Sequence, residues 1–253
     1  MKKGLAIMTA MLLLAVFAYA QITPPFTANF DGTEVPYMPS GWVKINVEGD
    51  SRSWITEASH GHSAPNCLYM NTNSPTGSDD WAISPSLHLS AGTSYNLEFY
   101  YRSDGPIWTE LLGVYLGSAP TVAAMQTHLT DVSITSWTYA ATSVTVTVPS
   151  TGNYFLGFYA HSAANMNFIA VDDVSLVAAT PLAEPVLTIT KVSRGVQLDW
   201  GNVPGANSYN IYASNDIPTS PDAWGLPIAS TNSFTYLYTG AERYKFFMVR
   251  ASN

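Results

Sequence analysis

The sequence predicts an all-β protein built from β-sandwiches, and three observations support this fold class. Charged residues make up 11% of the chain and aromatic residues 13%, a composition that suits half-buried strands better than surface helices. Apolar and polar residues alternate over 95–101 and 143–148, as in strands that bury one face. Strand-like segments recur about every 8–15 residues, which is typical of a sandwich. Only residues 121–129 are expected to form two turns of helix.

The first 20 residues have the pattern of a secretion signal. Two lysines precede an apolar run over 5–17, and an Ala-Tyr-Ala triplet then supplies the small residues that a signal peptidase accepts. An uncleaved membrane anchor is the alternative, but the apolar run is shorter than the ~20 residues that cross a bilayer. We therefore expect residues 1–20 to be removed and the mature protein to be secreted or held at a cell surface. No later stretch is long enough to span a membrane.

The charge of the mature chain excludes nucleic acid as a partner. Removing residues 1–20 takes two of the 10 basic residues, which leaves 8 against 18 acidic residues. A net charge of about −10 repels a phosphate backbone, and no cluster of Lys and Arg offsets it.

The only cysteine, Cys67, cannot form an internal disulfide, and its strand-like surroundings predict a buried apolar role. Stability must therefore come from core burial or from a metal.

A linker is expected at 178–185, where two prolines lie among small residues. The segment that follows contains strand-like runs and a Pro-Gly-Ala turn at 204–206. Over 184–252 it resembles a fibronectin type III domain, a seven-stranded sandwich, in the features Trp200, Pro204-Gly205-Ala206, Tyr209-x-Ile211-Tyr212 and Val249-Arg250-Ala251. This resemblance implies a fold and hardly any function, because such modules serve as spacers as often as binders.

The larger segment, residues 26–177, carries a series of short motifs in a fixed order. They are Phe30-Asp31-Gly32, Pro39-Ser40-Gly41-Trp42, an acidic loop before Trp54, Asp79-Asp80-Trp81-Ala82-Ile83-Ser84-Pro85, the strand 95–101 and Val171-Asp172-Asp173-Val174. In these features the segment resembles the secreted jelly-roll modules called choice-of-anchor or cleaved-adhesin domains, which occur in gingipain haemagglutinin regions and are similar in shape to MAM domains. The resemblance implies a jelly roll with an adhesive role.

Acids beside the first, middle and last strands suggest a structural calcium site. In a jelly roll the first and last strands commonly lie side by side, so Asp31 is expected to approach Asp172 or Asp173. Calcium takes six to eight oxygens at roughly 2.3–2.6 Å, so two or three such carboxylates suffice as anchors. Adjacent strand residues face opposite sides, so Asp172 and Asp173 can act together only if the strand is bulged. The alternative is that these acids are solvated strand ends.

The family resemblance adds a second group of acids. The family often carries an Asp-x-Asp-Gly-Asp-Gly loop, whereas the matching positions here read Asn46-Val47-Glu48-Gly49-Asp50-Ser51. Glu48 and Asp50 of this loop are further candidate calcium ligands, as is Asp79 beside the middle strand, although the departure from the family pattern weakens a metal site in the loop.

The motifs of catalysis are missing, and loop aromatics are the better functional lead. The sequence has no nucleophile elbow and no zinc-spaced His/Cys set, and His60-Gly61-His62 lies in a Gly/Ser/Pro-rich loop. Trp108 and Trp224 lie in expected loops, where each either folds back locally or stacks on a ligand. We expect a non-catalytic protein that binds glycan or extracellular protein. Two alternatives remain open, an architectural component without a discrete ligand and an ancillary module pair of a secreted hydrolase.

Overall fold

The computed structural model describes residues 21–180, 182–218, 221–240, 244 and 246–252. The chain forms two compact units that divide between Ala179 and Thr180. This division falls within the stretch 178–185 that is expected to be a linker. The expected secretion signal, residues 1–20, lies outside the described residues.

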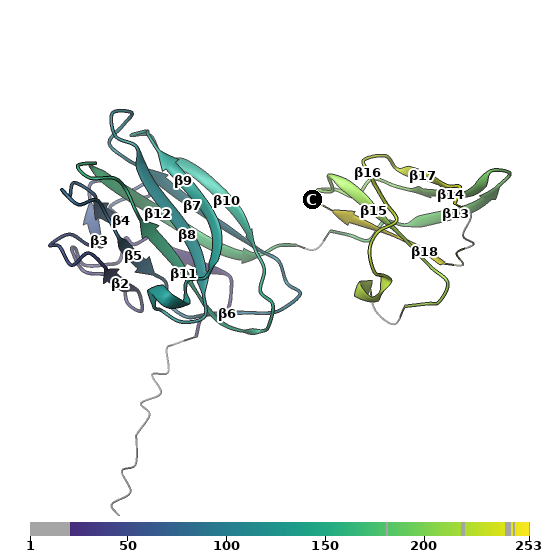
Figure 1. Ribbon diagram of the computed structural model, residues 1–253, viewed down its shortest axis with the longest axis horizontal. Helices are drawn as coiled ribbons and strands as arrows, with labels where there is room; N and C mark the ends of the chain where they lie inside the picture. The colour runs from purple at the N-terminus through teal and green to yellow at the C-terminus, as the bar shows by residue number, and fades with distance from the viewer. Residues whose placement is uncertain (1–20, 181, 219–220, 241–243, 245, 253) are drawn as a thin grey trace, which may run out of the picture. The chain divides into compact units, whose positions relative to one another are not determined.

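The larger unit is a sandwich of two antiparallel sheets (Figure 1). The first sheet has the strand order β10 (Ala140–Val146), β7 (Tyr95–Arg102), β12 (Phe168–Ala178), β4 (Asn66–Asn71) and β3 (Ile55–Ala58), with β1 (Phe26–Ala28) also on β12. The second sheet has the order β2 (Val43–Asn46), β5 (Asp80–Ile83), β11 (Gly152–Ala160), β8 (Glu110–Gly117) and β9 (Thr127–Ile134), with β6 (Leu87–Leu89) also on β11. The all-β prediction is confirmed.

The first and last strands of this unit lie side by side, as expected for a jelly roll. Strand β1 pairs antiparallel with β12, with Phe26 opposite Leu176 and Ala28 opposite Val174. Because β12 also pairs with β7 and β4, it lies inside the sheet, and this explains its nearly continuous burial. The acids of β12 are therefore held on a strand with neighbours on both sides.

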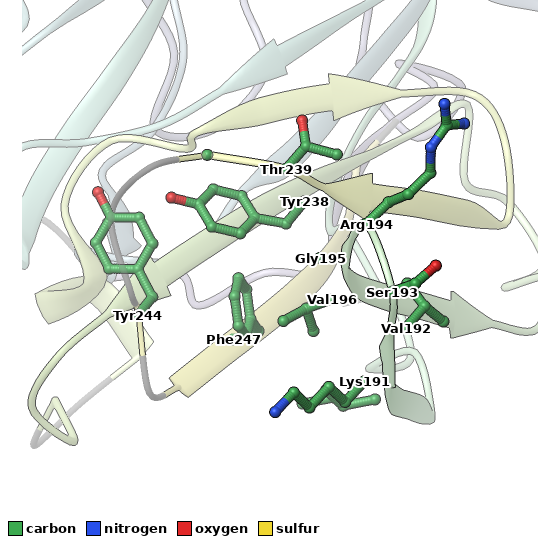
Figure 2. Close-up of a pocket in the computed structure, with 12 residues that line it drawn as sticks. Lys191, Val192, Ser193, Arg194, Gly195, Val196, Tyr238, Thr239, Tyr244 and Phe247 are labelled. Atoms are coloured by element: carbon green, nitrogen blue, oxygen red, sulfur yellow. The ribbon is translucent and has the colours of Figure 1, made fainter.

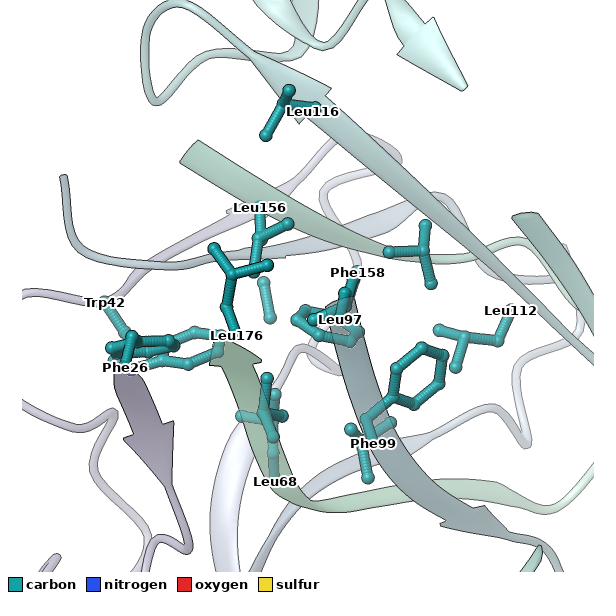
Figure 3. Packing of buried hydrophobic residues seen from close by; sticks show 14 of the residues in the cluster. Phe26, Trp42, Leu68, Leu97, Phe99, Leu112, Leu116, Leu156, Phe158 and Leu176 are labelled. Atoms are coloured by element: carbon teal, nitrogen blue, oxygen red, sulfur yellow. The ribbon is translucent and has the colours of Figure 1, made fainter. Parts of the chain in front are cut away.

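The alternating strands fill the space between the two sheets. Leu97 and Phe99 of β7 face Leu156 and Phe158 of β11 across the core, and all four side chains are fully buried (Figure 3). The rings of Phe99 and Phe158 meet edge to face, with centroids 5.4 Å apart. Each such side chain contributes roughly 1.5–3 kcal/mol on burial. Core packing thus stabilises the larger unit without a disulfide, since Cys67 is a free, buried thiol.

The expected helix over residues 121–129 is wrong. Only a 3-10 turn, η1 (Val122–Ala124), forms there, and β9 begins at Thr127. The residues of β9 include several β-branched side chains and pair along β8, so cross-strand pairing outweighs the short helical pattern. Among the described residues, no helix has the length and apolar character that a membrane crossing requires.

The smaller unit consists of two three-stranded sheets. One has the order β13 (Leu187–Val192), β14 (Gly195–Trp200) and β17 (Thr235–Tyr238), and the other β16 (Ala229–Thr231), β15 (Ser208–Ser214) and β18 (Phe246–Ser252). A 3-10 turn, η2 (Pro221–Trp224), precedes β16. Trp200, Tyr209 and Val249 lie in its core, as expected. The described residues thus form six strands here, one fewer than the seven expected.

Candidate functional site

The last strand of the larger unit is bulged where its two acids lie. The pairing of β12 with β7 shifts register between Asp172 and Ser175, and Asp173 has a φ of +46°. Because of this bulge, both carboxylates reach the same loop, residues 59–65. Asp172 Oδ2 accepts hydrogen bonds from the backbone amides of His62 and Ser63 at 2.7 and 3.1 Å. Asp173 Oδ2 lies 2.7 Å from Nδ1 of His62, and its Oδ1 accepts a hydrogen bond from the Ser63 hydroxyl.

We call Asp172, Asp173 and the loop 59–65 the bulge cluster. Asp172 is fully buried, and burial raises its pKa to about 6, while the hydrogen bonds that it accepts from backbone amides oppose the rise. Asp31 is not part of the bulge cluster. Asp31 Oδ1 accepts a hydrogen bond from the amide of Asn66 at 3.0 Å, and its Oδ2 accepts one from the side chain of Asn29. These three acids thus accept hydrogen bonds from protein donors, and the hydrogen bonds hold the loop 59–65 and the residue that follows it in place.

A second group of acids, the acidic loop cluster, consists of Glu48, Asp50, Asp79 and Asp80. Glu48 and Asp50 lie between β2 and β3, and the side chain of Asn46 holds their loop by donating to the carbonyls of Asp50 and Arg52 at 2.8 and 2.6 Å. Glu48 Oε2 accepts a hydrogen bond from the amide of Asp79 at 3.1 Å. The loop therefore brings Glu48 to the start of β5.

Asp80 is the residue of this cluster that the sequence reasoning missed. It is fully buried, and neither of its carboxylate oxygens makes a hydrogen bond of ordinary geometry, nor does Oε1 of Glu48. Burial, together with the neighbouring Glu48 carboxyl and the charge of Asp50, raises the pKa of Asp80 to about 8, and the nearby Ser53 hydroxyl opposes the rise. A signal was present in the sequence, because alternation along β5 places Asp80 on the same inner face as the buried Ala82.

The acidic loop cluster fits calcium better than the bulge cluster does. Buried carboxylate oxygens without donors are costly unless a cation or a proton neutralises them, and calcium accepts carboxylate and backbone oxygens together. Glu48 and Asp80 offer three such oxygens. However, no group of three or more His, Cys, Asp or Glu side chains in the described part of the chain is placed to hold a metal ion. A calcium ion would therefore need backbone carbonyls or waters as well, and it stays a proposal.

The outer face of the second sheet carries a row of aromatic rings, which we call the aromatic face: Trp81, Tyr115, Tyr159 and His161. Trp81 and Tyr159 lie opposite each other on β5 and β11 and stack with ring centroids 4.3 Å apart at 14°. Tyr159 in turn stacks on His161 at 4.9 Å and 19°. Tyr115 of β8 meets Trp81 at 5.2 Å. These rings pack in a cluster separate from the central core, beside Phe155, which is buried on this outer face.

Glycines let these rings lie along the sheet. A Cβ on Gly113 would come within 2.8 Å of the Tyr115 ring and 3.6 Å of the Tyr159 ring, and a Cβ on Gly157 would meet the Trp81 ring at 3.2 Å. The rings therefore extend over the glycine backbone. Tyr115, Tyr159 and His161 are partly exposed to solvent, whereas Trp81 is buried.

Polar side chains border the aromatic face. Burial raises the pKa of Tyr159 to about 12, and the Asp79 carboxylate beside it adds to the rise. His128 Nε2 lies 3.0 Å from Asp131 Oδ1, and both side chains are largely exposed. Partly exposed rings with carboxylates and imidazoles at their rim can stack on a flat ligand and hydrogen-bond to its edge.

The two tryptophans that the sequence singled out lie elsewhere. Trp108 is in the loop between β7 and β8 and is half-buried, and Trp224 ends η2 and is also half-buried. Neither contributes to the aromatic face. The exposed tryptophan of the described residues is Trp137, which is 63% exposed and packs its ring over Gly105.

A cavity of about 780 Å³ opens in the smaller unit, beside β13, β17 and β18 (Figure 2). Tyr238, Tyr244 and Phe247 contribute aromatic walls, and Lys191 and Arg194 lie on the side of the β13–β14 hairpin. None of the residues that the sequence analysis singled out for binding lines this cavity.

Comparison with known proteins decides the family of the larger unit. The family model described as Cleaved Adhesin Domain matches residues 26–176, which is more than half of the chain. The chain belongs to the cleaved adhesin family. A cleaved adhesin domain of Lys-gingipain from Porphyromonas gingivalis has a similar fold, with a TM-score of 0.51 at 18% identity over 61% of this chain and 98% of that domain. A second cleaved adhesin domain of Lys-gingipain gives a TM-score of 0.50 at 17% identity, over 60% and 98%.

Membership of the cleaved adhesin family confirms the jelly-roll resemblance and supports a non-catalytic adhesion or binding role for the larger unit. Such domains are typically extracellular or at the cell surface. No curated protein matches the chain. The family model ends at residue 176, so the fibronectin type III assignment of the smaller unit stays a prediction.

Proposed function

We propose that this protein is an extracellular adhesin whose larger domain recognises glycan through the aromatic face. The observation that carries the proposal is the group of partly exposed rings Tyr115, Tyr159 and His161, which lie on the outer face of a sheet around the buried Trp81. The flat, apolar side of a sugar ring packs against an aromatic ring, while its hydroxyls need donors and acceptors at the edge. Asp79 and Asp131 supply acceptors at that edge.

Calcium has a supporting role in this proposal. Glu48 and Asp80 would hold the ion, with further oxygens from the backbone of the loop, and the ion would supply the positive charge that their unpaired oxygens lack. Asp79 connects the two features, because its amide donates to Glu48 and its carboxylate lies beside Tyr159. Ordering the acidic loop would therefore also position one edge of the aromatic face.

A glycan array of the full mature chain tests the glycan proposal. Reproducible binding should weaken roughly fivefold for each of Tyr115→Ala and Tyr159→Ala, since a stacking contact contributes about 1 kcal/mol. Trp137→Ala, which removes an exposed ring from a loop, is the matched control and should bind normally. Trp108→Ala tests whether the half-buried loop tryptophan contributes instead.

Three results would contradict this function. Full binding by the Tyr115→Ala/Tyr159→Ala double variant would remove the aromatic face from the proposal. An array without reproducible hits would remove glycan as the ligand and favour the architectural alternative. Polysaccharide or peptide hydrolysis by the purified chain, abolished by one acid or serine substitution, would show a catalytic function instead.

A further inference from the structure

One end of the aromatic face carries an exposed carboxylate. Gly113 of β8 lies opposite Asp131 of β9 and opposite Tyr159 of β11, so these three residues form a row across the second sheet. Opposite residues of antiparallel strands place their side chains on the same face, and Tyr115 packs on that outer face beside Tyr159. We call Gly113, Tyr115, Asp131 and Tyr159 the Asp131 corner.

The side chains of the Asp131 corner converge on one point. The position of a Cβ on Gly113 lies 2.8 Å from the Tyr115 ring, 3.2 Å from Asp131 Oδ1 and 3.6 Å from the Tyr159 ring. Because glycine places no side chain between them, the carboxylate lies beside both phenol rings. The Asp131 side chain is 61% exposed and both tyrosines are partly exposed, so a ligand can reach the carboxylate and the rings together.

The outer face of the second sheet carries no Lys or Arg on its strands. These strands, all of whose residues the structure describes, contain one such residue, Lys44 of β2. Lys44 lies opposite Ala82, which is buried in the central core, so Lys44 faces the other way from Trp81. Arg52, in the loop between β2 and β3, is paired with Asp50. A cationic ligand therefore meets no Lys or Arg charge from the strands of this face.

The negative charge beside the rings comes from two carboxylates. Asp131 Oδ1 lies 3.0 Å from Nε2 of His128, and a neutral imidazole donates a hydrogen bond but leaves the charge of the carboxylate in place. Asp79 adds a second carboxylate beside Tyr159. Both charges favour a cation over an anion on this face.

We propose that the glycan recognised by the aromatic face carries a primary ammonium group, as in a 2-amino sugar, and that Asp131 selects it. This inference rests on the proposed function of the aromatic face. The ammonium donates charge-assisted hydrogen bonds to Asp131, while the sugar ring packs against Tyr115 beside it. An N-acetyl group at the same position has no charge, and the carboxylate of a uronic acid is repelled.

The lysine side chain of a partner protein offers the same cation. The amino sugar is favoured because the carboxylate lies against two partly exposed rings, which offer an apolar surface to the ring of a sugar. A lysine peptide is therefore included in the test as the competing source of the ammonium group.

The test uses the full mature chain and β-1,4-linked hexamers of glucosamine, N-acetylglucosamine and glucuronate, which differ in the charged group and share their linkage. Isothermal titration calorimetry at neutral pH measures each affinity. The glucosamine hexamer should bind about fivefold more tightly than the acetylated hexamer, as expected for an exposed charge pair, and the glucuronate hexamer should bind most weakly. Added salt should reduce the preference, because it screens exposed charges.

Substitutions of Asp131 provide the matched comparison. Asp131→Asn should lower the affinity for the glucosamine hexamer to that for the acetylated hexamer, which should bind as before. Glu98→Gln makes the same change of charge on the outward side of the first sheet and should alter neither affinity. Asp131→Lys should reverse the preference in favour of the glucuronate hexamer. Thermal melting of each variant shows that the domain is still folded.

Three outcomes would overturn the inference. These are a glucosamine hexamer that binds no better than the acetylated one, a preference that survives Asp131→Asn, and equal, Asp131-dependent binding of a lysine hexapeptide. The last would assign the corner to a protein cation.

Failure of the glycan proposal gives a different result. If glycans of the array still lose binding in the Tyr115→Ala/Tyr159→Ala double variant, the aromatic face binds glycan and only its selectivity for an amino sugar is wrong. If no glycan binds, both proposals fail.

Discussion

Two buried acids show how differently one residue type can behave in this fold. Asp172 is fully buried, but backbone amides of the loop 59–65 donate to it and limit the rise of its pKa to about 6. Asp80 is equally buried but makes no hydrogen bond of ordinary geometry, and its pKa rises to about 8. The first acid therefore fixes a loop, whereas the second needs either a proton or a cation.

The pH dependence of stability should reveal Asp80. Its pKa is raised to about 8 in the folded protein, above the ordinary value near 4, so its contribution to stability is present at low pH and is lost as pH rises. In chelator, the melting temperature of the larger domain should therefore fall between about pH 4 and pH 8. Asp172, whose pKa is raised to about 6, gives a slope of the same sign at the acid end of this range. Asp80→Asn should therefore flatten the slope between about pH 6 and pH 8, and the exposed Asp131→Asn should not. A slope unchanged by Asp80→Asn would contradict the assignment.

Removing the Asp172 carboxylate should destabilise the larger domain. Asp172→Ala leaves the amides of His62, Ser63 and Asp173 without an acceptor, and the cost should be ~3 kcal/mol. Chemical denaturation measures this change in the free energy of unfolding. The exposed Asp216→Ala in the smaller domain is the control. A loss below about 0.5 kcal/mol would show that water replaces the carboxylate without cost.

At the scale of elements, the second sheet combines an apolar inner face with an aromatic outer face on the same strands. In β11, Leu156 and Phe158 point into the core, while Phe155 and Tyr159 point outward. Glycines on β8 and β11 leave the space in which the outward rings lie. The strand pattern that stabilises the sandwich thus also presents the proposed ligand surface.

Filling the space at Gly113 should disturb the aromatic face without unfolding the sheet. In Gly113→Ala the new Cβ would lie 2.8 Å from the Tyr115 ring, and this ring is a side chain that can turn away. We expect weaker glycan binding and a nearly unchanged melting temperature. Gly201→Ala is the control, because no atom lies within 4 Å of its Cβ position. Normal binding by Gly113→Ala would argue against stacking on Tyr115.

At the scale of the whole molecule, each domain has a hydrophobic core of its own, and the acidic loop cluster belongs to the larger domain. Calcium should therefore act on the larger domain. Calorimetry of the intact chain can follow the unfolding of each domain separately.

Calcium should raise the unfolding transition of the larger domain alone. An ion that binds only the folded state adds ~2.7 kcal/mol when its concentration is a hundredfold above Kd. Glu48→Gln with Asp80→Asn should abolish the response, whereas Asp173→Asn should retain it if the acidic loop cluster is the site. If Asp173→Asn alone abolishes the response, the bulge cluster holds the ion. Identical transitions in calcium and in chelator would exclude both sites.

The sequence alone determined the fold class and the buried state of Cys67, because alternation and composition record which face of each strand is buried. The jelly-roll family followed from a resemblance in the order of its short motifs. The sequence also located Asp172 and Asp173 on the last strand and stated that only a bulge would let them act together. Residues 121–129 show the limit of such local patterns, since pairing with β8 made them a turn and a strand.

Only the tertiary structure decided which polar and aromatic groups meet. Asp80 differs from Asp79 through burial, and Trp81, Tyr115 and Tyr159 form one surface because strands distant in the chain lie side by side. The place of β18 beside β15 likewise depends on strand order, which no single strand encodes. Local sequence determines on which face of a strand a side chain lies, whereas long-range strand pairing determines which side chains lie beside it. Binding depends on these neighbouring side chains.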